Sequence, residues 1–117
     1  MTALRLISLP AHGALELLGG FALMASPFVF GFGPAGVVTA VLLGALLVGL
    51  ALSTASPDGD TLSVAAHHSF DYGIAIGLLG GALVLALADD RPAAIALLAA
   101  SVAQFALNIS TRYIATA

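Results

Sequence analysis

The sequence lacks cysteine and tryptophan, and it has few charged residues of either sign. Without cysteine there is no disulfide and no thiolate ligand. Charged residues make up 8% of the 117 residues, whereas a soluble domain carries roughly a quarter. The net charge of −3 and the absence of a basic run argue against a nucleic-acid partner. Without tryptophan, an aromatic belt at the membrane surface is expected to use Tyr72, Tyr113 and the phenylalanines.

The chain is instead rich in apolar sequence. Hydrophobic residues make up 61% of it, and the mean hydropathy is +1.13. Residues 17–57 contain no charged side chain. That run is too long for one helical crossing, because a hydrocarbon core of ~30 Å needs about 20 residues. The Gly- and Pro-rich stretch 31–36 divides it. The sequence therefore predicts an integral membrane protein in a lipid bilayer.

Four apolar segments are expected to cross the membrane as helices: residues 11–32, 35–53, 67–88 and 93–113. They are apolar on all sides, as is typical of membrane spans. Strands are not expected, because transmembrane barrels need at least about eight short alternating segments. Residues 54–60 form the only clearly aqueous loop of any length. Residues 1–117 are thus predicted to be one all-α membrane domain, a small bundle of two helical hairpins.

The basic residues predict the orientation of these hairpins. Arg5 and Arg112 lie on the side of the termini and the middle loop, and Arg91 lies on the other side. The positive-inside rule then predicts both termini in the cytoplasm. Residues 1–10 loosely resemble the start of a signal peptide, but Glu16 interrupts the apolar stretch and no clear cleavage site follows. We therefore expect the first segment to remain in the mature protein.

The two hairpins are predicted to be diverged copies of one unit. His12 and Glu16 open the first segment, and His67 and Asp71 open the third, each 55 residues further along the chain. The repeats would cover about residues 11–54 and 67–114, with Pro34 aligned to Pro92 at the second helix of each. Because each repeat crosses twice, the two copies would run parallel about an axis along the membrane normal.

Small residues at four-residue spacing predict where helices pack. They are Gly36, Ala40 and Gly44 in the second segment, Gly73, Gly77 and Gly81 in the third, and Ala99 and Ala103 in the fourth. In lipid, small residues let helix backbones approach closely. We expect these faces to pack inside one bundle, with a dimer interface as the alternative.

A group of polar residues is predicted at one side of the membrane. His12 and Glu16 share a helix face, as do His67 and Asp71, because residues four apart stack on a helix. The fourth segment ends on the same side and brings Gln104, Asn108 and Arg112 toward them. His68, next to His67 in the third segment, also belongs to this polar group. Charged groups in a membrane helix need a partner, so the carboxylates are expected to pair with Arg112 or a histidine.

Three interpretations of this polar group remain open. The first is structural: acidic side chains favour the positive N-terminal ends of helices, with the histidines among lipid head groups. The second is a cofactor or metal site, because histidine and carboxylate pairs at this spacing can share a ligand. Neither the metal nor the cofactor is specified. The third is a proton- or ion-coupled transport site that uses Glu16 and Asp71.

Ser26 and Pro27 predict a kink in the first segment. Proline lacks the backbone N–H and frees the carbonyl of Leu23, which Ser26 or a neighbouring helix can satisfy. The run LGGFALMASPFVFGF, residues 18–32, with the following apolar helix, resembles a unit of the SPW-repeat family. That family consists of small bacterial membrane proteins with Ser-Pro-Trp in the first helix of a two-helix repeat.

The resemblance covers about residues 12–54, with Phe28 in place of the tryptophan. The second half has Gly81-Ala82-Leu83 at the aligned position and lacks the motif. The family implies this topology and a bacterial cytoplasmic membrane, and no activity. The chain is also similar in length and helix number to small multidrug transporters, which carry a glutamate in the first helix. It lacks their aromatic substrate surface.

No nucleophile with its base, no phosphate-binding loop and no complete metal motif is present in the sequence. The sequence therefore favours a non-enzymatic membrane protein, a structural or accessory subunit. Its partners would be a larger membrane complex or further copies of itself. The alternatives are a small proton- or ion-coupled transporter that uses Glu16 and Asp71, and a membrane protein that binds a metal or cofactor through the His/carboxylate cluster.

Overall fold

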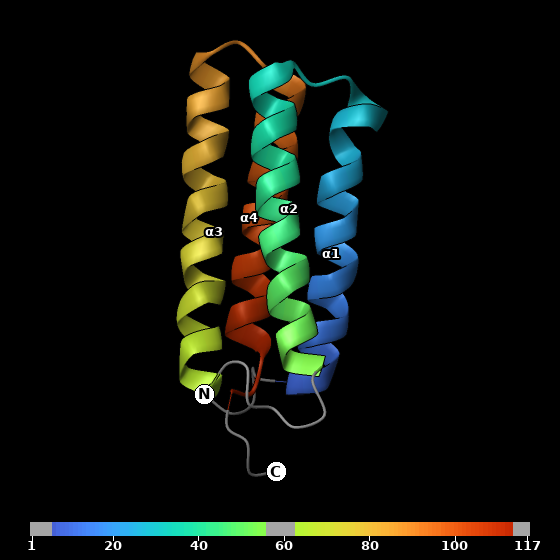
Figure 1. Cartoon of the computed structure of the whole chain (residues 1–117). Coiled ribbons are helices and arrows are strands. Elements are labelled where there is room, and N and C mark those ends of the chain that lie inside the picture. The colour runs from blue at the N-terminus through green and yellow to red at the C-terminus, as the bar shows by residue number, and fades with distance from the viewer. Residues whose placement is uncertain (1–5, 56–62, 114–117) are drawn as a thin grey trace.

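The structure is a computed structural model that describes residues 6–55 and 63–113. It consists of four helices, as predicted, and they are α1 (Leu9–Phe30), α2 (Pro34–Ala55), α3 (Val64–Leu87) and α4 (Arg91–Ser110) (Figure 1). Each helix is long and apolar enough to cross a membrane. The predicted all-α four-helix bundle is therefore confirmed, and its helices indicate an integral membrane protein. The predicted aqueous loop 54–60 falls mostly outside the described residues.

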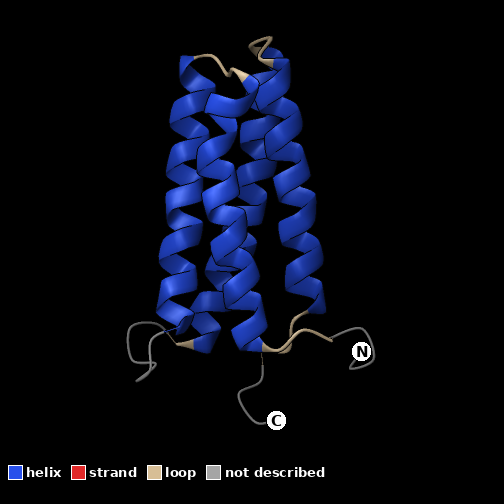
Figure 2. Ribbon diagram, turned by 90° about the vertical axis from the view of Figure 1, so that its right-hand side faces the viewer, coloured by secondary structure: helices blue, strands red, loops and turns tan. Residues whose placement is uncertain are grey.

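The helices run alternately up and down and pair as two hairpins, α1 with α2 and α3 with α4 (Figures 1 and 2). The first turns of α1 and α3 therefore lie at the same end of the bundle as the last turns of α2 and α4. A short backbone pairing closes this end. Ile7 donates its N–H to the carbonyl of Ser110 (3.0 Å), and Arg112 donates to the carbonyl of Ile7 (2.9 Å).

The bundle is apolar outside, and its buried ionisable side chains lie at one end inside. Large apolar side chains such as Leu87 and Phe28 are 88% and 74% exposed, which suits a surface in contact with lipid. The centre of the bundle is packed with leucine and alanine, for example Leu78 and Leu97, both fully buried. His12, Glu16 and Asp71 are buried as well, so polar side chains lie inside, where partners are available.

The first turns of α1 and α3 are built in the same way. Ser8 precedes α1 and accepts a hydrogen bond from the N–H of Ala11, and Ser63 precedes α3 and accepts one from Ala66. Such caps satisfy N–H groups that a helix start leaves unpaired. The two serines are again 55 residues apart. The serine cap is thus repeated at the same 55-residue spacing that relates the two predicted copies.

Pro27 lies inside α1, and the helix continues past it to Phe30. The hydroxyl of Ser26 donates to the freed carbonyl of Leu23 at 2.7 Å, which confirms the predicted role of this serine. Gly31 caps the end of the helix, and its φ of 71° is left-handed. At this far end of the bundle, Asp90 precedes α4 and accepts a hydrogen bond from the N–H of Gly33 at 2.9 Å, which joins the two hairpin turns.

Gly36, Ala40 and Gly44 are buried, as predicted for a packing face of α2. α1 and α2 approach each other closely at Gly20 and Gly44. A Cβ built on Gly44 would lie 2.8 Å from the carbonyl oxygen of Gly20, closer than real contacts allow. The seam therefore joins two helices of one hairpin, which is the predicted arrangement.

The predicted packing face of α3 is wrong for two of its three glycines. Gly73 and Gly77 are exposed, and a Cβ on Gly73 would meet nothing within 4 Å. Gly81 does pack, because a Cβ there would lie 3.0 Å from Leu97. The face that turns inward instead carries Asp71, Ile74, Ala75, Leu78, Ala82 and Leu85. The buried carboxylate decides which side of α3 faces the bundle.

The prediction for α4 is wrong in the same way. Ala99 and Ala103 are exposed, and the buried face carries Ala93, Leu97, Ser101, Gln104 and Asn108. The hydroxyl of Ser101 donates to the carbonyl of Ala75 on α3 at 2.8 Å. Ala99 and Ala103 instead line a cleft between α4 and α1.

Candidate functional site

Four polar side chains meet inside the bundle at the end where α1 and α3 begin. His12 and Glu16 come from the first two turns of α1, and His67 and Asp71 come from the first two turns of α3. All four are buried, with exposed fractions of 0%, 1%, 4% and 0%. The predicted grouping of the two pairs is confirmed.

The four side chains form a closed ring in which imidazoles and carboxylates alternate. His12 Nε2 lies 3.2 Å from Glu16 Oε2 and 3.0 Å from Asp71 Oδ2. His67 Nε2 lies 3.2 Å from Glu16 Oε1 and 3.3 Å from Asp71 Oδ1. Each carboxylate therefore faces both imidazoles, and each imidazole faces both carboxylates. One ligand atom from each residue can be chosen so that all four lie within 4.8 Å of one another.

The hydrogen bond on the other ring nitrogen of His12 fixes the role of Nε2. Nδ1 lies 2.7 Å from the hydroxyl of Thr111, and that hydroxyl donates its one proton to the carbonyl of Leu107 at 2.6 Å. Thr111 must therefore accept, and His12 Nδ1 must carry a proton. Nε2 then holds either a second proton or a lone pair. A lone pair facing two carboxylate oxygens is favourable only if a cation lies between them.

The end of α4 holds the two carboxylates in place. Gln104 donates from Nε2 to Glu16 Oε2 at 2.9 Å and to Asn108 Oδ1 at 3.1 Å. Tyr113, which follows α4, donates its hydroxyl to Asp71 Oδ2 at 2.7 Å. Asn108 Oδ1 also lies 3.2 Å from the tyrosine hydroxyl. Residues 104–113 thus orient three of the four side chains of the ring.

Two buried polar atoms in this region have no hydrogen-bond partner among the described residues: Asp71 Oδ1 and Asn108 Nδ2. Asp71 Oδ1 does lie near His67 Nε2, but outside hydrogen-bonding geometry. Burying such an atom without a partner costs free energy, so each one has a reason in most proteins. For Asp71 Oδ1, coordination of a metal ion is a sufficient reason.

Tyr113 has a role that differs from its predicted one. It is 9% exposed, so it does not belong to an aromatic belt at the membrane surface. Burial raises the pKa of its phenol, and the hydrogen bond to Asp71 raises that pKa further. The hydroxyl therefore stays protonated and remains a donor to the carboxylate well above neutral pH.

The other four residues of the predicted polar group lie outside the ring. Arg112 is exposed; of the two predicted partners for the carboxylates, Arg112 or a histidine, the structure shows the histidines. His68 is half-buried and packs edge-on against Tyr113, with ring centroids 4.4 Å apart. Asn108 belongs to the supporting layer rather than to the ring. Sequence reasoning missed the part played by Thr111, although a hydroxyl just after a polar helix face was a signal for it.

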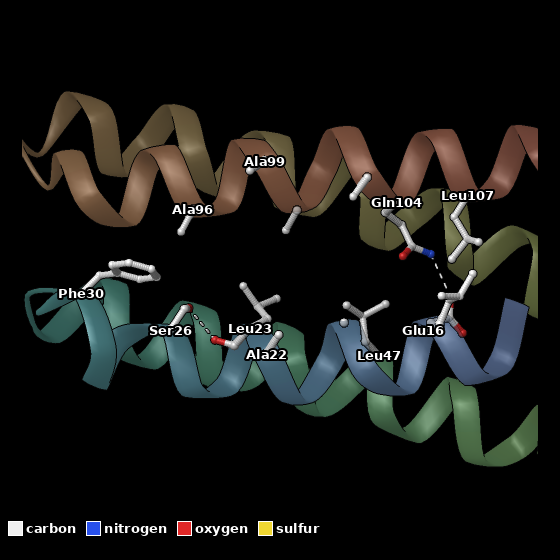
Figure 3. Close-up of a pocket in the computed structure, with 14 residues that line it drawn as sticks. Glu16, Ala22, Leu23, Ser26, Phe30, Leu47, Ala96, Ala99, Gln104 and Leu107 are labelled. Atoms are coloured by element: carbon white, nitrogen blue, oxygen red, sulfur yellow. Dashed lines mark hydrogen bonds between the residues drawn. The ribbon is translucent and has the colours of Figure 1, made fainter.

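An apolar cleft of about 590 Å³ adjoins the ring between α1 and α4 (Figure 3). Its walls carry small and aliphatic residues such as Ala22, Leu23 and Ala99. Phe30 and Ser26 lie toward one end, and Glu16 and Gln104 toward the other (Figure 3). The cleft therefore connects the outer, lipid-facing surface with the neighbourhood of the polar ring.

The ring brings four donor groups close enough together to approach one metal ion. In a tetrahedral site with bonds of 2.0–2.1 Å, neighbouring ligand atoms are about 3.3 Å apart. The four nitrogen–oxygen distances here are 3.0–3.3 Å, and they use both oxygens of each carboxylate. With one donor atom from each residue, all four lie within 4.8 Å of one another, so a tetrahedral ion would draw the most distant donors closer together. Calcium, which prefers six to eight oxygen ligands at about 2.3–2.6 Å, fits poorly. Two imidazoles with two carboxylates suit a divalent ion such as Zn²⁺ or Fe²⁺.

The chain matches no protein-family model, no curated protein and no solved structure. The resemblance to an SPW-repeat unit, and the bacterial cytoplasmic membrane that it implies, therefore stay predictions. The predicted orientation also stays a prediction, because Arg5 lies outside the described residues.

Proposed function

We propose that this protein is a membrane metal-binding protein that holds one divalent transition-metal ion between His12, Glu16, His67 and Asp71. The observation that carries the proposal is the closed ring of two imidazoles and two carboxylates, with neighbouring donor atoms 3.0–3.3 Å apart. This is the second of the interpretations that the sequence left open.

The charge of the ring supports the proposal. Two neutral imidazoles and two carboxylates carry −2, which a divalent cation cancels. A neutral centre avoids the high cost of an uncompensated charge inside a bilayer. Two protons, one on each imidazole, also cancel this charge. The site is therefore an exchange site, in which one divalent ion replaces two protons and the net charge stays the same.

The supporting layer also suits a metal centre. Histidine ligands of metals usually donate their other ring N–H to an oxygen, which fixes the ring and the tautomer. His12 does this through Nδ1 and Thr111. The carboxylates receive hydrogen bonds from Gln104 and Tyr113. Ligands held in this way are preorganised, so less free energy is spent on ordering them when the ion binds.

The test is a titration of the purified full chain with Zn²⁺ against a chromophoric chelator. We expect one Zn²⁺ per chain, and we expect His67→Gln and Asp71→Asn each to weaken binding by more than about 100-fold, the upper end for loss of an outer partner. His68→Gln is the matched control, because His68 is the neighbouring histidine and lies outside the ring. Circular dichroism on each variant shows whether the bundle is intact.

Two results would contradict the proposal. One is a folded wild-type protein that takes up no Zn²⁺ or Fe²⁺. The other is a His68→Gln variant that loses as much affinity as His67→Gln. The accessory-subunit role stays a prediction, since the exposed apolar surface suits lipid as well as a protein partner. The transport role also stays a prediction. The proposed site shares with it only the exchange of protons for a cation.

A further inference from the structure

The cleft between α1 and α4 is long, apolar and open to the side of the bundle. It extends along α1 from Glu16 to Phe30, which at 1.5 Å per residue is about 20 Å. A volume near 590 Å³ is within the usual range of small-molecule sites, about 300–1,000 Å³. Alanines on the facing side of α4, among them Ala99 and Ala103, leave the space that larger side chains would fill.

One end of the cleft offers a hydrogen-bond acceptor. Gln104 is 5% exposed, and both of its hydrogen bonds to described residues use Nε2. The amide orientation follows from chemistry, because the carboxylate of Glu16 needs a donor. The carbonyl oxygen of Gln104 therefore turns toward the cleft (Figure 3). At the other end, the hydroxyl of Ser26 already donates to Leu23.

These features select the occupant. A lipid acyl chain would fill the apolar part but leave the Gln104 oxygen without a donor, which is unfavourable for a buried polar atom. A phospholipid head group is charged and bulky, whereas the polar end of the cleft lies about two helical turns inside the start of α1. A single hydroxyl at the end of a long apolar chain satisfies both the volume and the acceptor.

We propose that this cleft binds a long-chain alcohol, which enters from the lipid and donates its hydroxyl proton to Oε1 of Gln104. The apolar chain would lie along α1 between Leu23 and the alanines of α4, toward Phe30. Binding requires no ion in the ring, because the contact is with the outer side of the supporting layer. The inference therefore goes beyond the metal proposal and can be tested separately from it.

The test uses the full chain in phosphatidylcholine vesicles and a photoreactive long-chain alcohol with a diazirine in its chain. Labelling is expected on α1 and α4 residues that line the cleft, as mapped by mass spectrometry. Unlabelled alcohol should compete about tenfold better than its methyl ether, which cannot donate, because one hydrogen bond of about 1.4 kcal/mol corresponds to that factor.

Two variants give a matched comparison. Ala99→Phe fills the cleft without touching the ring and should reduce labelling by about tenfold or more, whereas Ala45→Phe, on an exposed position of α2, should leave it unchanged. Labelling before and after treatment with a chelator should be equal. Equal competition by the alcohol and its ether, or equal labelling of Ala99→Phe and wild type, would overturn the inference. Zn²⁺ titration of the same samples reports the metal site independently.

Discussion

His12 Nδ1 and the Thr111 hydroxyl lie 2.7 Å apart, and the proton between them belongs to the histidine. The contact joins the first turn of α1 to the residue after α4, at opposite ends of the described chain. It depends on the backbone pairing of Ile7 with the end of α4. The closure of the bundle therefore determines which nitrogen of His12 faces the carboxylates.

The first prediction concerns this contact. Thr111→Val removes the acceptor and leaves the Nδ1–H of His12 buried without a partner. We expect Zn²⁺ affinity to fall about 10–100-fold, as for other outer partners of histidine ligands. Thr39→Val is the control, because Thr39 bonds its own helix at Ala35 and lies on α2. An affinity unchanged in Thr111→Val would show that the ring orientation does not depend on this bond.

The second prediction concerns proton release. If both imidazoles of the ring carry Nε2 protons without metal, each Zn²⁺ bound should release about two protons. Apparent affinity should then rise by about 100-fold per pH unit in the range where the free site is protonated. Isothermal titration calorimetry in buffers of different ionisation enthalpy counts these protons. No release at any pH would mean that the imidazoles are neutral in the free site.

The third prediction uses Tyr113. Tyr113→Phe removes a hydrogen bond to Asp71, and we expect a loss of about 1.5–3 kcal/mol in the free energy of unfolding in mixed micelles. The folded-state pKa of Tyr113 is raised above its ordinary value of about 10. The stabilisation is therefore fully present below pH ~10 and is lost as pH rises through the folded-state pKa. The unfolding free energies of wild type and variant should therefore differ below pH ~10 and approach each other only at higher pH. Equal unfolding free energies at every pH would contradict the hydrogen bond.

The fourth prediction separates packed glycines from exposed ones. A Cβ on Gly44 would lie 2.5 Å from Met24 Cγ, so Gly44→Ala should force α1 and α2 apart and cost about 1–3 kcal/mol. Gly73→Ala meets open space and should be neutral, or stabilising by up to about 1 kcal/mol through helix propensity. Unfolding of the two variants in the same detergent series compares them directly. Equal destabilisation by both variants would contradict the close packing of α1 against α2 at Gly44.

Most of the fold could be predicted from the sequence, because four apolar runs with polar turns leave few alternatives in a membrane. The i,i+4 pairs and the alternating topology also sufficed to bring His12 and Glu16 to His67 and Asp71. The inward face of α3 could have been predicted correctly from the cost of exposing a carboxylate to lipid. Asp71 must turn inward, and the positions three, four and seven residues later then face inward too, which excludes Gly73 and Gly77.

The supporting layer was harder to predict. Thr111 and Tyr113 follow the last helix, where periodicity gives no direction for side chains. Their positions depend on the pairing of Ile7 with the end of α4, a contact between residues 7 and 111 that no local pattern encodes. The sequence left Arg112 and the histidines as alternative partners of the carboxylates, and only the packing of the helices shows that the histidines lie against them.

X-ray absorption spectroscopy of the Zn²⁺-loaded protein reports directly whether the four ring residues hold the ion. We expect four nitrogen or oxygen ligands at about 2.0–2.1 Å, with the outer-shell scattering of two imidazoles. We also expect His67→Gln to remove one imidazole contribution and His68→Gln to remove none. A six-coordinate spectrum of oxygen ligands without imidazole scattering would show that Zn²⁺ binds elsewhere, and would contradict the assignment of the ring as a metal centre.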